Sequence, residues 1–321
     1  MRFLQALIIV IPLAAAFHAA AQEYPSRTVR MVAPFAPGGA TDALARLVGQ
    51  KLSERWRQTV IVDNRPGASG NIGAEIAARA APDGHTLVVA GAPHAINMTL
   101  YRNLAYDLGR DLVAIARLAG YPSAIIVHPS LPVKSVKELI ALAKARPGEL
   151  NFGSPAPGSP NRLAIELFMI MAKVKMAHIP YKGGSGQMVT DLVAGQVQVA
   201  AMGLPPSIAY IKAGRLRALA VTSEKRAALL PDLPTVSEAG LPGFDVTSWF
   251  GVFAPAALPR NIVTKVNGDV TAVLEMPDVK ERLERLGAEP APQSPDDFAR
   301  FVRDEIARWA KVVKASGATA D

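Results

Sequence analysis

Short apolar runs alternate along this chain with longer stretches in which apolar residues recur every three or four positions. The runs predict buried strands, and the longer stretches predict amphipathic helices. In the first part of the chain, strands are expected near residues 29–34, 60–62 and 86–90, with helices between them. Strands that alternate with helices predict a mostly parallel sheet covered by helices on both faces.

Two further apolar runs, 112–118 and 124–127, are joined through Gly120, Tyr121 and Pro122. We interpret this join as the crossing into a second domain, and we expect a strand over 249–254 to cross back. About 300 residues is more than one core usually organises, which also favours two domains.

One arrangement occurs three times: a strand, a glycine-rich turn and a helix start, within residues 31–52, 151–172 and 178–195. Glycine lets the backbone approach a ligand closely, and the free N–H groups of a helix start attract anions. In the first copy Thr41 and Asp42 fit the N-cap and first-turn positions, and in the second Ser159 is the expected cap. The alternative is that these are ordinary turns; no nucleotide-binding glycine fingerprint is present. Three copies favour a site for an anion.

The first 21 residues have the pattern of a secretory signal peptide. Arg2 precedes an apolar run that extends to about Phe17, and small residues follow it before Gln22. A membrane anchor would need roughly 20 apolar residues, and this run is shorter. We therefore expect a secreted, periplasmic protein. Because cysteine is absent, disulfides, thiol catalysis and thiolate metal sites are excluded.

The formal charge of +8 falls to +7 when Arg2 is removed with the signal peptide. A basic exported protein suits anionic partners. Aromatic residues make up only 6% of the chain, and acidic residues are mixed among the basic ones, as in KERLERLG. These features argue against a nucleic-acid surface, so small anions are the better match.

Few residues offer catalytic chemistry. His85 and His128 lie beside predicted turns, and His178 opens a strand, where a structural role is expected. His94 follows a strand end, where a pocket role and a structural role are equally open. No His, Asp or Glu cluster has metal-ligand spacing, so no metal site is expected. Ser154 lies in GSPAPGSP, which is not the GxSxG of a serine nucleophile. We predict no enzyme and no cofactor.

With these features established, YPSRTVRMVAPFAPGGATD, GSPAPGSPNRLAIELF and HIPYKGGSGQMVTDLVAGQV resemble segments of the Bug family. Its members are extracytoplasmic solute-binding receptors of tripartite tricarboxylate transporters. The resemblance covers essentially the whole mature chain. It implies an α/β type II periplasmic-binding-protein fold, with two α/β lobes and a ligand cleft between them. We expect a signal peptide over 1–21, a first lobe of 22–121 plus 247–321, and a second lobe of 122–246.

The resemblance also implies that loops at helix starts in both lobes hold a small carboxylate through backbone N–H groups, hydroxyls and water. In the first lobe the expected ligand-binding residues are Phe35, Pro37, Gly38, Gly39, Thr41, Gly91, Ala92 and His94. In the second lobe they are Ser154, Gly158, Ser159, Asn161, Tyr181, Gly183 and Gly184.

Two departures from the family pattern bear on the ligand. Arg162 stands where the family usually has His, and it could pair with a second carboxylate or be solvated. Gly203 and Leu204 replace an Asp-Asn pair whose acid would hold an ammonium in amino-acid-binding members. We therefore predict a ligand without an amine.

The resemblance implies a receptor, expected to be monomeric, that delivers its carboxylate to the membrane subunits of a tripartite tricarboxylate transporter. The alternative is a receptor that signals to a membrane sensor kinase. A secreted hydrolase is disfavoured because the sequence places no acid and base beside a nucleophile.

Overall fold

The computed structural model describes residues 24–181 and 184–320, so the predicted signal peptide and Gly183 lie outside the described residues. The first lobe contains a sheet with five strands in spatial order. These are β2 (Val60–Asn64), β1 (Val29–Ala33), β3 (Thr86–Gly91), β9 (Thr247–Pro255) and β4 (Leu112–Val127). Strand β1 is parallel to β2 and β3, whereas β9 is antiparallel to β3 and β4. The short β10 (Glu289–Pro290) pairs with β4.

The second lobe repeats this order. Its strands are β6 (Ala177–Pro180), β5 (Asn151–Ser154), β7 (Val199–Gly203), β4 and β8 (Arg217–Val221). Strand β5 is parallel to β6 and β7, and β4 is antiparallel to β7 and β8. In each lobe the fourth strand is therefore one that crosses from the other lobe.

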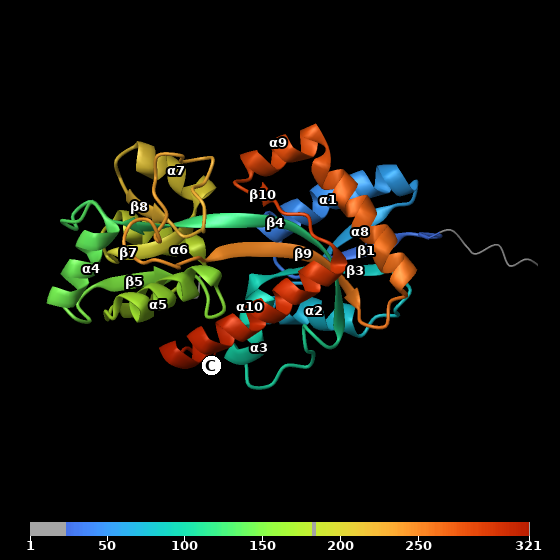
Figure 1. The fold of residues 1–321 in the computed structure, drawn as a ribbon, viewed down its shortest axis with the longest axis horizontal. Coiled ribbons are helices and arrows are strands. Elements are labelled where there is room, and N and C mark those ends of the chain that lie inside the picture. Colours follow the sequence, from blue (N-terminus) through green and yellow to red (C-terminus); the bar gives the residue numbers. More distant parts are fainter. Residues whose placement is uncertain (1–23, 182–183, 321) are drawn as a thin grey trace, which may run out of the picture.

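Strands β4 and β9 run side by side between the lobes and form the hinge (Figure 1). The two apolar runs predicted at 112–118 and 124–127 form one continuous strand of 16 residues, and Gly120, Tyr121 and Pro122 lie within it where the crossing was predicted. These residues stay extended because they pair with β9. Pairing with the second-lobe strand β7 begins at Ser123. The lobe bounds near residues 121 and 247 stay a prediction.

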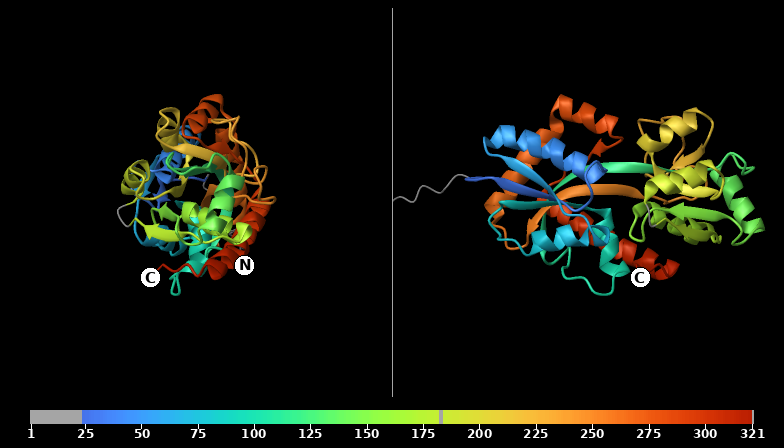
Figure 2. Two further views of the ribbon diagram at one scale, coloured as in Figure 1. Left: turned by 90° about the vertical axis from the view of Figure 1, so that its left-hand side faces the viewer. Right: turned by 180° about the vertical axis from the view of Figure 1, so that it is seen from behind.

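Helices cover both faces of each sheet (Figures 1 and 2). In the first lobe, one face carries α1 (Ala40–Trp56), α8 (Arg260–Glu275) and α9 (Pro277–Arg285), and the other carries α2 (Asn71–Ala78), α3 (Ala92–Leu100) and α10 (Pro295–Ser316). A short 3-10 helix, η1 (Ala68–Gly70), precedes α2. In the second lobe, α4 (Val136–Ala145) and α5 (Pro160–Ala172) lie on one face, and α6 (Ser185–Val193) and α7 (Leu204–Lys212) lie on the other.

The core shows where the lobes are joined. One buried cluster extends through both lobes and includes Ile96 and Trp309 of the first lobe with Phe152 and Phe168 of the second. On the opposite faces, the cluster under α1, α8 and α9 is separate from the cluster under α6 and α7. The lobes are therefore packed together beside α3, α5 and α10, and a crevice between them is expected on the side of α1 and α6.

A buried charge joins α1 to α8. The carboxylate of Asp269 accepts hydrogen bonds from Trp56 Nε1 at 2.7 Å and Lys265 Nζ at 3.0 Å, and it also pairs with Arg55. Burial alone would raise the pKa of Asp269, but the hydrogen bonds from Trp56, Arg55 and Lys265 outweigh it and lower the pKa.

Among the helices within the described residues, none is long and apolar enough to cross a membrane.

Candidate functional site

The first predicted loop joins β1 to α1. Gly38 has a φ of +85°, which favours glycine, and Gly39 is the N-cap, with no side chain bonded to the first turn. The sequence suggested Thr41 as the N-cap, and this prediction is wrong. Thr41 is the second residue of the helix and is buried. The helix starts early because the Asp42 carboxylate accepts the Gly38 N–H at 3.0 Å and closes the turn. The exposed Pro37 and Gly39 leave the helix start open to an anion.

Asp42 places a buried negative charge in the same turn. Arg46 lies 3.0 Å from it, and Asn64 donates to it at 2.9 Å. Burial would raise the pKa of Asp42, but hydrogen bonds from Arg46, Gly38 and Asn64 outweigh it and lower the pKa. The positive charge of Arg46 compensates the negative charge of Asp42. Asp42 can therefore hold the loop without presenting an unpaired negative charge to an anion.

The second loop of the first lobe joins β3 to α3, a helix that the sequence reading missed. Gly91 is its N-cap and Ala92 its first residue, and both are buried. His94 Nδ1 accepts the Gly91 N–H at 3.1 Å, and its Nε2 lies 3.3 Å from the Gly70 carbonyl oxygen. Complete burial lowers the pKa of His94 to about 4, so the ring is neutral at pH 7, with its proton on Nε2.

Both nitrogens of His94 are thus occupied within the first lobe, which indicates a positioning role. The Phe35 ring meets the His94 ring edge-on, with 5.9 Å between centroids. The structure therefore brings Phe35, Gly91, Ala92 and His94 together as one wall beside η1. Direct contact of this wall with a ligand stays a prediction.

The second lobe presents the β5–α5 loop. Ser159 is the N-cap of α5, as predicted, and accepts the Asn161 N–H at 3.2 Å. The Asn161 Oδ1 accepts a hydrogen bond from Ser123 Oγ of β4 at 3.0 Å, which ties the loop to the hinge. Ser154, at the end of β5, is buried, and its Oγ lies 2.7 Å from His178 Nε2.

The β6–α6 loop lies beside it. The Tyr181 N–H donates to the Ser154 carbonyl oxygen at 2.9 Å, and the Tyr181 hydroxyl donates to Asp191 at 2.9 Å. Burial, with that hydrogen bond, raises the pKa of Tyr181 to about 12. Gly184 has a φ of +89° and caps α6 without a side-chain bond. The structure thus joins Ser154, Tyr181 and Gly184 at the ends of two adjacent strands.

The two halves of the site meet at Gly158. A Cβ atom added at Gly158 would lie only 2.5 Å from Asn97 Oδ1, so this second-lobe loop touches α3 of the first lobe. Asn97 is fully buried; its Nδ2 donates to the Ser69 carbonyl oxygen at 3.1 Å and to Asn71 Oδ1 at 2.9 Å. The remaining amide atoms, Asn97 Oδ1 and Asn71 Nδ2, are buried and have no hydrogen-bond partner within the described part of the chain.

The sequence reading missed Asn71 and Asn97. One signal was available: Pro93 directly after a strand-ending glycine is typical of a helix start. The helix that follows places Asn97 one turn beyond His94. Buried amides with unused donors and acceptors are uncommon, so the two asparagines are candidates for contacts made when the lobes or a ligand move.

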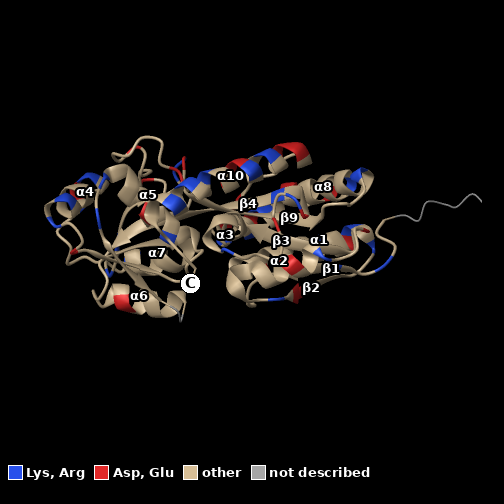
Figure 3. Cartoon of the chain, turned by 90° about the horizontal axis from the view of Figure 1, so that it is seen from below, with Lys and Arg blue, Asp and Glu red and all other residues tan. Residues whose placement is uncertain are grey.

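Arg162 is not solvated, but its Nε is buried without a hydrogen-bond partner among the described residues, so pairing with a second ligand carboxylate stays a prediction. Its side chain is 12% exposed, and its Nε lies 3.5 Å from Glu166 Oε1. Its Nη1 lies 3.5 Å from the Thr319 carbonyl oxygen, so it spans from α5 to the C-terminal segment. None of the described site residues is a Lys or Arg, and many basic side chains lie on outer helices such as α4 and α10 (Figure 3). An anion in this site would therefore be held mainly by neutral donors.

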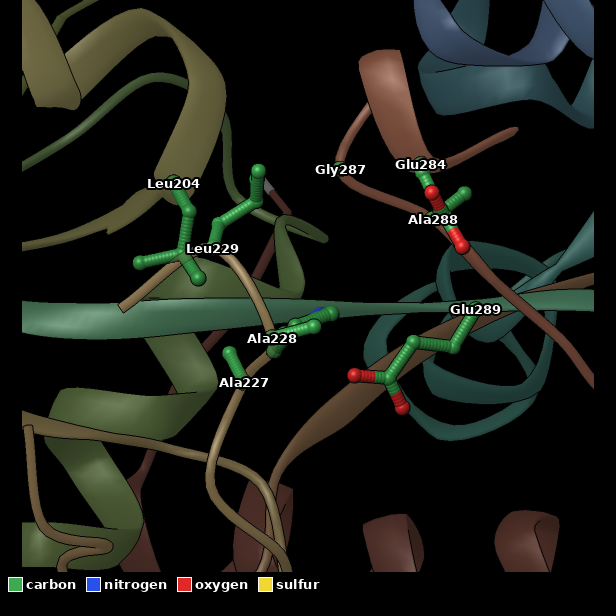
Figure 4. A pocket seen from close by; sticks show the side chains of 9 residues that line it. Leu204, Ala227, Ala228, Leu229, Glu284, Gly287, Ala288 and Glu289 are labelled. Atoms are coloured by element: carbon green, nitrogen blue, oxygen red, sulfur yellow. The ribbon is translucent and has the colours of Figure 1, made fainter. Parts of the chain in front are cut away.

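A separate apolar hollow of about 160 Å³ lies between the lobes beside β4 (Figure 4). Leu204 and Leu229 line it from the second lobe, and Gly287 and Ala288 line it from the first. None of the described site residues lines this hollow.

Two α/β lobes joined by the crossing strands β4 and β9, with glycine-rich loops at strand ends in each lobe, are the arrangement of a solute-binding protein. The chain belongs to the tripartite tricarboxylate transporter family receptors (TctC), whose family pattern matches residues 44–318. The predicted relationship to Bug proteins is confirmed: BugT of Bordetella pertussis is 38% identical over 300 residues, which span 93% of this chain and 92% of BugT.

Solved structures confirm the predicted fold class. R. palustris Rpa4515, solved with adipate, has a TM-score of 0.81 and 43% identity, covering 92% of this chain and 99% of that protein. MatC of Rhodopseudomonas palustris, solved with malate, has a TM-score of 0.77 and 35% identity, covering 90% of this chain and all of MatC at 100%. The chain is accordingly a solute receptor of the Bug type and not an enzyme.

Proposed function

We propose that this chain is an exported, periplasmic receptor that closes its two lobes on a small dicarboxylate and presents it to the membrane subunits of a tripartite tricarboxylate transporter. The observation that carries the proposal is that each lobe has a helix start on a strand-end loop. Gly39 caps α1 in the first lobe, and the loop with Gly158 leads into α5 in the second. Gly158 of that loop touches Asn97 of the first lobe. The solved relatives with adipate and malate support a dicarboxylate.

The expected affinity is reachable with neutral donors. Micromolar binding requires about 8 kcal/mol. Hydrogen bonds to a charged group contribute about 1.5–3 kcal/mol each, so four or five of them, less the cost of immobilisation and closure, reach that order. One helix dipole, at about 0.3–1 kcal/mol, would not. The ligand must therefore be contacted by both lobes at once.

Calorimetry with adipate, malate, citrate and aspartate tests the binding proposal. We expect micromolar binding of a dicarboxylate and much weaker binding of aspartate, because Gly203 offers no acid for an ammonium group. If none of these carboxylates, nor any in a wider thermal-shift panel, binds the mature protein, the proposal is wrong. Ligand uptake by cells with and without the transporter membrane subunits tests delivery separately, and N-terminal sequencing of the secreted protein tests cleavage before Gln22.

A further inference from the structure

His178 is a polar side chain that the sequence reading left as structural. It lies on β6, directly beside Phe152 of β5 in the parallel pair, and its ring packs on the Phe152 ring with centroids 4.9 Å apart. Its Nε2 lies 2.7 Å from Ser154 Oγ. Ser154 is only 1% exposed, and its carbonyl oxygen accepts the Tyr181 N–H. The His178 ring and the Ser154 hydroxyl are therefore held against each other by the strand pair.

The protonation of His178 is fixed by its surroundings. Burial lowers its pKa to about 4, and the positive charge of Arg162, the charged group that bears on it, lowers it further in the same direction. At neutral pH the ring is uncharged, so one nitrogen donates and the other accepts. The pair with Ser154 can then be made in two ways.

The two arrangements differ in what Ser154 offers a ligand. If Nε2 accepts, the only hydroxyl hydrogen of Ser154 is used on the ring, and the serine presents lone pairs alone. If Nε2 carries the proton and donates, the hydroxyl hydrogen is free for another acceptor. A carboxylate has no donor of its own, so it can bind Ser154 only in the second arrangement.

We propose that His178 is a positioning residue that donates from Nε2–H to Ser154 Oγ and thereby directs the serine hydroxyl hydrogen to the bound carboxylate. This inference rests on the proposed function, because it requires a carboxylate beside Ser154. It assigns His178 no contact with the ligand. The neutral ring orients the donor without adding a charge to the site.

The first test is a double-mutant cycle measured by calorimetry with adipate. His178→Phe keeps an aromatic ring on Phe152 but removes both nitrogens, and Ser154→Ala removes the hydroxyl. We expect each change to weaken binding by about 10- to 100-fold, and the double variant to bind no more weakly than Ser154→Ala alone. His178→Gln, whose amide can donate, should recover part of the loss.

His128→Phe is the matched control, because His128 Nδ1 makes a 2.7 Å contact with Ser130 Oγ outside the candidate site. It should bind adipate as the wild type does. The inference would be overturned, with the proposed function intact, if the fold-loss in affinity of the double variant equalled the product of the two single fold-losses. It would also be overturned if Ser154→Ala bound adipate with wild-type affinity. Failure of the wild type to bind any small carboxylate would overturn both.

The second test needs no variant and so holds even if His178→Phe does not fold. Nitrogen chemical shifts of the histidine rings report which nitrogen is protonated. In the adipate-bound wild-type protein, His178 should show a protonated Nε2 and an unprotonated Nδ1. A bound protein with the proton on Nδ1 would contradict the inference.

Discussion

The contact between Gly158 and Asn97 allows a quantitative prediction about how the lobes meet. A Cβ atom at Gly158 would lie 2.5 Å from Asn97 Oδ1 and 3.4 Å from Leu100 Cδ2. An ordinary carbon–oxygen contact needs about 3.3 Å, so the loop and α3 would have to separate by about 0.8 Å. Asn97 cannot turn aside freely, because its Nδ2 bonds to Ser69 and Asn71 would break.

Gly158→Ala should therefore weaken carboxylate binding. Overpacking of this kind costs about 1–3 kcal/mol, which corresponds to a loss of about 5- to 150-fold in affinity. The ligand-free protein can relieve the clash by moving the lobes apart, so its melting temperature should change by only a few degrees. Calorimetry with the ligand found for the wild type and a thermal unfolding scan measure the two effects.

Removing the opposing atom should restore the fit. Asn97→Ala alone loses two hydrogen bonds and is expected to destabilise the first lobe by about 1–3 kcal/mol. In that background, however, adding Gly158→Ala should cost little further affinity, because Oδ1 is gone. Gly268→Ala is the control, since a Cβ atom there meets nothing within 4 Å in α8. An unchanged affinity in Gly158→Ala, or the same loss with and without Asn97, would refute the contact.

Three further predictions follow from other parts of the molecule. Among the described residues, a Cβ atom at Gly39 meets only the Ala36 carbonyl oxygen, at 3.7 Å. Gly39→Val should therefore fold normally yet weaken binding of the same ligand as Gly158→Ala does. If a binding assay shows an effect at only one of these glycines, the ligand is not held by both lobes. Asp269→Asn should lower the free energy of unfolding by about 3 kcal/mol at pH 7. Because folding lowers the pKa of Asp269, its charge stabilises the fold above the ordinary pKa of about 3.9, and this stabilisation is lost as pH falls through the pKa of the folded state. In urea unfolding, the difference in unfolding free energy between Asp269→Asn and wild type should therefore be smaller at pH 3 than at pH 7. The same difference at both pH values would contradict a stabilising charge at Asp269. Gly203→Asp should improve aspartate binding relative to malate. If calorimetry gives an unchanged ratio of the two affinities, position 203 does not contact the ligand amine.

Local sequence signals predicted many of the helix boundaries. Ser159 caps α5 as expected, and its hydroxyl accepts the Asn161 N–H. Ser135 and Ser294 cap α4 and α10 by the same chemistry, and each accepts the N–H three residues later. The helix start at Thr41 was misplaced by the same logic. There a tertiary feature decided, since Asp42, held by Asn64 from β2, captured the turn.

Long-range features were beyond local patterns. Gly120 to Pro122 have turn-forming residues, yet pairing with β9 keeps them in one strand. A long charged side chain such as Arg162 is usually solvated on a helix, yet this one is covered because α5 meets the C-terminal segment. Asn97 became a candidate only when the lobes were seen together, since its opposing residue, Gly158, lies far along the chain. Residues that meet only where the two lobes touch are therefore the part of the site least accessible to sequence reasoning.

The central claim is that one ligand draws the two lobes together. Because the chain contains no cysteine, spin labels can be placed cleanly at Gln50→Cys and Thr190→Cys, two exposed positions. They belong to α1 and α6, which lie on different lobes (Figure 1). Electron-paramagnetic-resonance distance measurements should show a broad distribution without ligand and a shorter, narrower one at saturating dicarboxylate. An unchanged distribution under conditions where calorimetry shows the ligand bound would contradict the account.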